Sequence, residues 1–388
     1  MAVACPPASC LVAQPTTTPS YPLRQQLAHD KQQPHWHDWK WQFKNRIKTR
    51  SQLASYLPLT PAEEAAFEQG GYNLPFAITP YYLSLMNPDD ANDPLRQTVV
   101  PTLQEFIRLP EELDDPCGED GDMVVPGLVH RYPDRVLLLV NETCSVYCRY
   151  CTRSRLVGSG EHDVNLEAAF AYLEAHPEVR DVLISGGDPL VMDDGKLEGI
   201  ISRLRAIPSI KVLRMGTKIP TVLPQRITPQ LVTMLKRYAP LYMSIHFTHT
   251  NELTPEVAEA CNRLADAGIV TFSQTVLLNN VNDTPEQMRD LMQGILELRV
   301  RPYYIYQCDP VAGTGHFRTQ VQTGLDIMEH LRGHITGYAV PTYVIDGPGG
   351  GGKIPLSPTY IEQLNDDGLV VRNYKHQRYT YANPKPVA

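Results

Sequence analysis

The sequence lacks the features that mark membrane, secreted and nucleic-acid-binding proteins. Its 388 residues contain no apolar run close to the roughly 18 residues that a membrane-spanning helix needs. The segment 1–21 has no basic stretch followed by an apolar one, so no secretory signal peptide is expected. A formal net charge of −8 argues against nucleic acid as the main partner. We therefore expect a cytoplasmic protein with neither a membrane nor a nucleic-acid partner.

The eight cysteines also lack the paired framework of disulfide-rich secreted proteins. Three of them lie close together as Cys144-x3-Cys148-x2-Cys151, directly after the apolar run 136–140. Three thiolates at this spacing can hold an iron–sulfur cube, which normally takes four cysteine ligands. One iron would then stay open to a substrate or cofactor. A zinc site that lacks one ligand and a group of buried thiols are the alternatives.

The order of polar and apolar stretches predicts four regions. Residues 1–34, rich in Pro, Gln and Thr, are expected to form a disordered leader, and residues 35–125 a mainly helical N-terminal domain. Over residues 126–340, short apolar runs alternate with helical stretches, which is typical of βα units around a parallel sheet. Residues 341–388 are expected to form a lysine-bearing loop and a C-terminal tail.

Six predicted βα units without a Rossmann glycine fingerprint indicate an α/β fold, a partial (βα)6 barrel of the TIM type. The predicted strands are 136–140, 182–185, 212–215, 242–247, 270–276 and 303–307. In such barrels the residues just past the carboxyl ends of the strands face the active site. This rule selects the three cysteines, Ser185, Gly186, Gly187, Asp188, Lys218, His246, Gln274 and Asp309.

The pair Gly186-Gly187 removes side chains at a strand end, which allows a close approach of the backbone to a bulky partner. On its own, such a turn is more often a plain geometric requirement than a binding site.

The glycine run that precedes Lys353 has the spacing of the first half of a phosphate-binding loop. However, Ile354 stands where a Ser or Thr must hold magnesium, and Pro355 disrupts the helix that such a loop requires. A desolvated lysine on a glycine loop can instead form an imine with an aldehyde cofactor. Taken by spacing alone, an exposed lysine on a surface loop is the simpler interpretation.

Two acids and one arginine could bind the ends of an amino acid. Asp309 and Asp346 would bind an alkylammonium group if they converge, since the cation would relieve their mutual repulsion. Each acid alone is more often a loop cap. Arg153, two residues after the last cysteine of the run, could pair bidentately with a carboxylate.

Several segments together resemble the lysine 2,3-aminomutase family of the radical S-adenosylmethionine (SAM) class, from about Trp36 to about Lys353. They are Trp39-Lys-Trp41-Gln42, Ile78-Thr-Pro-Tyr-Tyr-Leu-Ser-Leu85, 125–135, the cysteine run, Tyr303-Tyr-Ile-Tyr306-Gln-Cys-Asp309 and 347–353. The resemblance implies an isomerase that interconverts L-lysine and L-β-lysine, with a SAM-derived 5′-deoxyadenosyl radical and pyridoxal 5′-phosphate (PLP).

The resemblance also implies a role for individual residues. Cys144, Cys148 and Cys151 would bind a [4Fe–4S] cluster, while Ser185, Gly186, Gly187, Asp188, His246 and Gln274 would line the SAM pocket. Lys353 would hold PLP as an imine and act as the catalytic lysine, with Arg131 and Arg135 at the PLP phosphate. Arg153 would bind the substrate carboxylate, and Asp309 with Asp346 the ε-ammonium. A flavodoxin or ferredoxin is the implied type of reductant.

The sequence departs from the family in its cysteines. The best-known members carry a C-terminal cysteine cluster, joined by one earlier cysteine, that binds a structural zinc near the subunit contact. Here Thr284 occupies the earlier position and the tail 373–388 has no cysteine. We therefore predict no zinc. The homo-oligomer that we expect would then lack a zinc site near its subunit contact.

Three alternative functions stay open. An arginine aminomutase would also use two acids, since guanidinium pairs with carboxylates. A glutamate aminomutase is disfavoured because those acids would repel a distal carboxylate. A non-catalytic iron–sulfur protein would explain the cysteines but not Lys353, Asp309 and Asp346.

Overall fold

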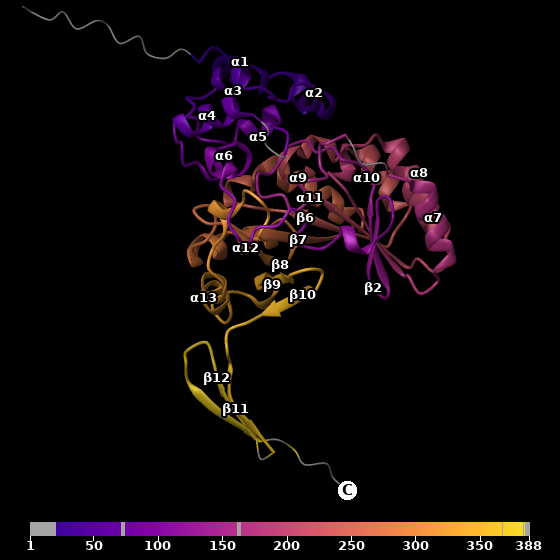
Figure 1. The fold of residues 1–388 in the computed structure, drawn as a ribbon, viewed down its shortest axis with the longest axis vertical. Helices are drawn as coiled ribbons and strands as arrows, with labels where there is room; N and C mark the ends of the chain where they lie inside the picture. Colours follow the sequence, from indigo (N-terminus) through magenta and orange to yellow (C-terminus); the bar gives the residue numbers. More distant parts are fainter. Residues whose placement is uncertain (1–20, 71–73, 161–163, 367, 383, 385–388) are drawn as a thin grey trace, which may run out of the picture.

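The computed structural model describes residues 21–70, 74–160, 164–366, 368–382 and 384, and contains a barrel, a helical cap and a small separate sheet. Figure 1 shows the helical N-terminal part above the barrel and the small sheet projecting from its lower end. None of the helices in the described residues has the length and apolar content needed to cross a bilayer.

A ten-stranded sheet in the order β1 to β10 forms the barrel. The pairs from β3–β4 to β8–β9 are parallel, whereas β1, β2 and β10 pair antiparallel at the two edges. The predicted partial barrel is therefore confirmed. Its strands are β1 Met123–Val125, β2 Leu128–Tyr132, β3 Arg135–Leu139, β4 Asp181–Ser185, β5 Val212–Thr217, β6 Leu241–His246, β7 Val270–Leu277, β8 Arg301–Gln307, β9 Thr342–Gly347 and β10 Gly352–Leu356.

The barrel helices pack on the outside of the strands, and three of them begin with Thr followed by Pro. Thr228, Thr254 and Thr284 each accept a hydrogen bond from the backbone three residues later, at 3.1, 3.2 and 3.3 Å. Thr284 thus caps a helix at the position where the family's zinc cysteine is expected. The barrel helices are α7 Leu166–Ala175, α8 Asp194–Ala206, α9 Ile219–Val222, α10 Pro229–Lys236, α11 Pro255–Asp266, α12 Pro285–Glu297 and α13 Val321–Leu331, with η4 Pro189–Val191, η5 Pro224–Arg226, η6 Thr250–Glu252, η7 Gly315–Phe317 and η8 Gly337–Ala339.

The N-terminal part is helical but begins earlier than predicted. Pro22–Asp30 forms helix α1, so the disordered leader is wrong for these residues, and residues 1–20 lie outside the described residues. Arg24 anchors α1 because it donates to the Tyr56 carbonyl at 2.5 Å and pairs with Asp89 at 2.9 Å. The other elements are η1 Pro34–His37, α2 Trp39–Lys44, α3 Arg50–Ala54, α4 Pro61–Gln69, α5 Pro80–Leu83, α6 Pro94–Val99, η2 Leu103–Phe106 and η3 Asp120–Asp122.

The chain ends in strands. Lys353 is the second residue of β10, so the predicted lysine-bearing loop is a β-hairpin in which the glycines form the turn. The tail folds into a three-stranded antiparallel sheet of β11 Ile361–Asn365, β12 Gly368–Arg372 and β13 Arg378–Ala382. The domain boundaries near residues 125 and 340 stay predictions.

Candidate active site

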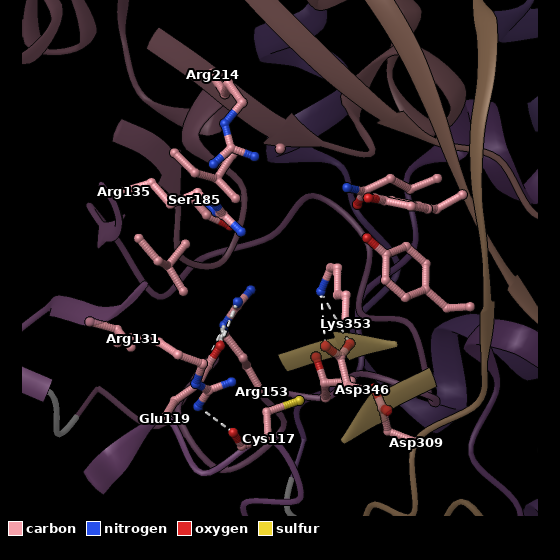
Figure 2. Close-up of a pocket in the computed structure, with 18 of the residues that line it drawn as sticks. Cys117, Glu119, Arg131, Arg135, Arg153, Ser185, Arg214, Asp309, Asp346 and Lys353 are labelled. Atoms are coloured by element: carbon pink, nitrogen blue, oxygen red, sulfur yellow. Dashed lines mark hydrogen bonds and ion pairs between the residues drawn. The ribbon is translucent and has the colours of Figure 1, made fainter. Parts of the chain in front are cut away.

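A cavity of about 640 Å³ lies inside the barrel and brings together most of the predicted site residues. Figure 2 shows arginines on one side of this cavity and Lys353 with two acids on the other. The predicted residues that line it are Arg131, Arg135, Arg153, Ser185, His246, Gln274, Asp309, Asp346 and Lys353.

The three cysteines follow β3 and lie at the edge of this cavity. Their neighbours Tyr150, Thr152 and Arg153 line the cavity, although the cysteine side chains do not. Burial raises the pKa of all three thiols, that of Cys151 to about 11, and for Cys144 and Cys151 the neighbouring cysteines add to the effect. A bound cluster would relieve this cost because its irons favour the thiolate.

The three cysteine sulfurs, which lie in the described part of the chain, are not all within 4.8 Å of one another. Within the described chain, the group of Cys, His, Asp and Glu ligand atoms found within 4.8 Å of one another is Cys117, Asp309 and Asp346, not the cysteine run. Zinc–sulfur bonds are about 2.3 Å long, so two sulfur ligands of one zinc ion must lie less than 4.8 Å apart. The three thiols therefore fit a multi-iron cluster better than the zinc site that was the alternative.

The Gly186-Gly187 pair makes its close contact with the segment that leads into the cysteine run. A Cβ on Gly186 would lie 2.3 Å from the backbone carbonyl oxygen of Asn141, and one on Gly187 would lie 2.4 Å from that of Thr143. The Gly187 N–H also donates to the Asn141 carbonyl at 2.7 Å. These glycines therefore fix the start of the cysteine loop against β4.

Asp188 points into the protein. Its carboxylate accepts hydrogen bonds from the Thr217 hydroxyl at 2.7 Å and the Lys218 N–H at 2.8 Å, and it does not line the cavity. Burial raises the pKa of Asp188 to about 6 in spite of these bonds. Asp188 thus links the end of β4 to the end of β5.

His246 and Gln274 lie side by side on β6 and β7, where they are register partners. Burial, with the positive charges of Lys218 and Arg153, lowers the pKa of His246 to about 3. His246 is therefore a neutral imidazole at the cavity wall.

Lys353 reaches the cavity from the β9–β10 hairpin. Gly347 pairs with Gly352 across the turn, and Gly349, Gly350 and Gly352 have φ values of 65°, 94° and 74°. Such left-handed backbone suits glycine. The next residue pair in the register is Lys353 opposite Asp346, whose side chains form an ion pair at 3.0 Å.

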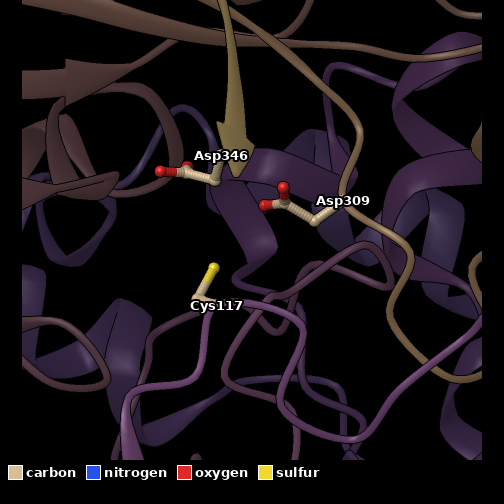
Figure 3. A group of neighbouring side chains, drawn as sticks. All are labelled: Cys117, Asp309 and Asp346. Carbon is tan, nitrogen blue, oxygen red and sulfur yellow. The ribbon is translucent and has the colours of Figure 1, made fainter. Parts of the chain in front are cut away.

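Asp309 and Asp346 converge with the Cys117 thiol at one end of the cavity, as Figure 3 shows. Burial and the charge of Asp346 raise the pKa of Asp309 to about 7. Burial, together with both acids, also raises the pKa of Cys117 to about 12. This end of the cavity therefore favours a cation.

The opposite side carries arginines that already have acidic partners. Arg131 pairs with Asp122 at 2.6 Å and also donates to the Cys117 carbonyl, whereas Arg214 pairs with Asp181 at 2.8 Å. Arg135 pairs with Asp134 at 3.0 Å and lies over the Tyr132 ring. These guanidinium groups suit an anion such as a phosphate.

Arg153 lies between the two sides and makes a side-on pair with Glu119. Arg153 Nε donates to both Glu119 oxygens at 2.9 and 3.1 Å, and Nη2 donates at 2.7 Å. Burial lowers the pKa of Arg153, but Glu119 outweighs burial and the pKa is raised overall.

The sequence interpretation missed Cys117, Glu119 and Arg214. Arg214 could have been found, because it is a charged residue inside the apolar strand 212–215. Cys117 and Glu119 lie in a loop that the sequence assigned to the helical domain, and no periodic signal marks them.

Comparison with known families agrees with this site. A model of the radical SAM superfamily matches residues 138–292, which include the cysteine run and the strands from β4 to β7. The barrel, its three-cysteine loop and this match define the chain as a radical SAM protein, a class that uses a [4Fe–4S] cluster and SAM.

More specific matches are a family model of the C-terminal part and proteins that are similar over nearly the whole chain. A model described as lysine-2,3-aminomutase matches residues 328–388. An L-lysine 2,3-aminomutase from Clostridium subterminale is 49% identical over 93% of this chain and 88% of that protein. One from Acetoanaerobium sticklandii is 51% identical over 91% and 86%, respectively. The chain belongs to the lysine 2,3-aminomutase family.

A glutamate 2,3-aminomutase from Clostridioides difficile is also similar. It is 41% identical over 88% of this chain and 81% of that protein. The similar proteins thus include enzymes named for two different amino acids, lysine and glutamate.

Proposed function

We propose that this protein interconverts L-lysine and L-β-lysine. One observation carries the proposal: Lys353, two acids, Arg153 and the neighbours of the cysteine run line a single cavity of about 640 Å³. Lysine has a carboxylate at one end and an ammonium at the other, which matches an arginine and a pair of acids in the same space.

In this proposal each cofactor has its own residues. Cys144, Cys148 and Cys151 hold the [4Fe–4S] cluster, and Ser185, His246 and Gln274 line the SAM pocket. Gly186, Gly187 and Asp188 hold the segments around this pocket in place through their contacts with the cysteine loop and with β5. Lys353 links PLP covalently. Arg131 and Arg135 bind the PLP phosphate, and Arg214 joins them because it lines the same side.

When bound, the cluster and SAM supply a carbon radical and PLP supplies a conjugated carrier for the migrating nitrogen. The chain itself binds and orients the substrate. Arg153 holds the carboxylate, and Asp309 with Asp346 holds the ε-ammonium. The Lys353 amine lies 3.0 Å from Asp346, which supports a cation at the position where this proposal puts the ε-ammonium. The substrate ammonium takes this place once Lys353 is engaged with PLP.

The acid pair favours a distal cation over a distal carboxylate. A glutamate side chain would add a third negative charge next to Asp309, whose pKa is already raised to about 7 by burial and Asp346. Arginine fits the charge but needs more length than lysine. A non-catalytic iron–sulfur protein would have no need of a cavity with these opposite charges.

We further propose a cytoplasmic homo-oligomer that takes electrons from a flavodoxin- or ferredoxin-type reductant. A low-potential electron is needed to reduce the cluster, and a reducing compartment keeps the thiols free. The exposed tail sheet carries large apolar side chains suited to a subunit contact: Ile361, Leu364, Tyr379 and Tyr381.

The test is an assay of anaerobic protein with SAM, PLP and dithionite. Lysine, arginine and glutamate are offered separately and the products are identified by mass spectrometry. The proposal expects β-lysine as the main product. A preference for arginine or glutamate would contradict the assignment of lysine as substrate. If iron-loaded protein converts none of the three amino acids, the proposal that this protein is an aminomutase would be wrong.

A further inference from the structure

The loop that contains η3 connects the arginines of the cavity to the lysine hairpin. This acidic loop, residues 115–122, supplies Asp122 to Arg131 and Glu119 to Arg153. Asp115 and Asp120 pair with Arg155 at 3.3 and 2.8 Å. One loop thus sets the position of three arginines.

The acidic loop is fixed against the turn that leads to Lys353. Gly118 has φ 65°, and a Cβ at this position would lie 3.0 Å from the Gly349 carbonyl carbon and 3.1 Å from the Gly350 nitrogen. The backbone next to Glu119 therefore packs directly on the hairpin turn. Glu119 has a defined place relative to both Arg153 and Lys353.

The Glu119–Arg153 pair is mostly buried, with side-chain exposures of 9% for Glu119 and 23% for Arg153. Burial raises the pKa of Glu119, but Arg153 together with Arg155 and Arg131 outweighs burial, so that the pKa is lowered and the carboxylate stays ionised. A charged pair in this setting is geometrically well defined because two donor nitrogens, Nε and Nη2, make three hydrogen bonds to the two carboxylate oxygens.

The cavity also contains acids that compete for Arg153. Asp309 and Asp346 line the same cavity, and Arg153 already lowers the pKa of Asp309 in opposition to burial and Asp346. An arginine released from Glu119 would be drawn toward these acids. It would then neutralise the ammonium site and leave the carboxylate site empty.

Resting on the proposed function, we infer that Glu119 is a positioning residue that keeps the two charged ends of the cavity apart. Glu119 engages Nε and Nη2 of Arg153, which leaves the Nη1 edge for a substrate carboxylate. At the same time it holds Arg153 away from Asp309 and Asp346. Glu119 thereby preserves an ammonium site that it does not contact.

The experiment compares Glu119→Gln and Glu119→Ala with the parent enzyme and with Asp120→Asn. Asp120 is the matched control because it lies on the same loop, pairs with Arg155, and is 60% exposed. The measurements are kcat and KM for lysine, inhibition by norleucine, which has only the carboxylate end, and inhibition by n-pentylamine, which has only the ammonium end.

We expect KM for lysine to rise about tenfold or more in both Glu119 variants, with kcat changed less than about threefold. Inhibition by norleucine and by n-pentylamine should both weaken about tenfold, whereas Asp120→Asn should match the parent. The Gln variant retains the size of Glu119, so it serves if the Ala variant does not fold. Unchanged inhibition by n-pentylamine, or an unchanged or lower KM, would overturn the inference.

A double variant distinguishes the positioning of Arg153 by Glu119 from a purely structural role of Glu119. In Glu119→Gln/Arg153→Gln no arginine remains to occupy the acid pair. Inhibition by n-pentylamine should return to the parent value, while lysine and norleucine binding stays weak. Failure of this rescue would contradict the inference. Failure of the parent to convert lysine would instead contradict the proposed function.

Discussion

The two sides of the cavity differ in how their charges are compensated. On one side Arg131 and Arg214 each pair with an acid of the protein, as does Arg153 between the two sides. On the other side Asp309 and Asp346 face each other, and burial with this repulsion raises the pKa of Asp309 to about 7. The arginines are thus held in place by acids before a ligand binds, whereas the two acids share one internal cation, Lys353, which pairs with Asp346 at 3.0 Å. Once Lys353 is engaged with PLP, the acids favour a cation from the substrate.

The largest expected effect comes from removing the amine that joins the two sides. Lys353→Ala should lower activity more than about a thousandfold, since the covalent link to PLP is lost. Borohydride reduction followed by peptide mass spectrometry should find PLP on Lys353 in the parent and on no lysine in the variant. Lys196→Ala, on the exposed face of α8, is the control. PLP attached to another lysine would show that Lys353 has a different role.

Asp346→Asn tests the acid side. Loss of one charge-assisted hydrogen bond should weaken lysine binding by roughly 1–3 kcal/mol, seen as a higher KM. The exposed Asp326→Asn on α13 should leave KM unchanged. If Asp346→Asn also leaves KM unchanged, the ε-ammonium binds elsewhere.

The raised pKa of Asp309 predicts that binding of the lysine ammonium at the acid side of the cavity depends on pH. Asp309 is neutral below its pKa of about 7, so kcat/KM for lysine should fall about tenfold between pH 8 and pH 6. Asp309→Asn should lower kcat/KM and flatten this part of the profile. A profile that keeps its shape in the variant would assign the titration to another group.

Arg214→Gln tests the arginine side and should have the smallest effect. Arg214 is partly exposed, with 31% of its side chain accessible, so its loss should weaken PLP binding only a few-fold. The KM for lysine should stay the same, as measured with saturating PLP. A raised KM for lysine would mean that the two sides are not independent.

The sequence predicted the repeating parts of this protein better than the singular ones. The six predicted strands, which correspond to β3 to β8, follow from their apolar runs. The helices between them follow from apolar periodicity and from local Thr-Pro starts such as Thr254-Pro255. The order of the strands then places Ser185, His246 and Gln274 at one cavity, as the barrel rule predicts.

The rest depends on contacts between distant segments. Glu119 has no local pattern, and its role appears only because Arg153 and the hairpin turn at Gly349 fold onto it. Helix α1 was missed because its stability comes from Arg24 contacts with residues far along the chain, not from composition. Lys353 was expected on a loop for a different reason: the glycine run and Pro355 hide a hairpin that is local in sequence, with β10 paired to β9.

The central claim is that the cysteine run and Lys353 act on the same bound amino acid. The most direct test uses lysine deuterated at its β-carbon, with mass spectrometry of the adenosyl group recovered after turnover as SAM or 5′-deoxyadenosine. The account predicts deuterium at the 5′-carbon of this group, because the abstracted hydrogen mixes there before it returns to the product, and β-lysine as product. Formation of β-lysine with an unlabelled adenosyl group would contradict it.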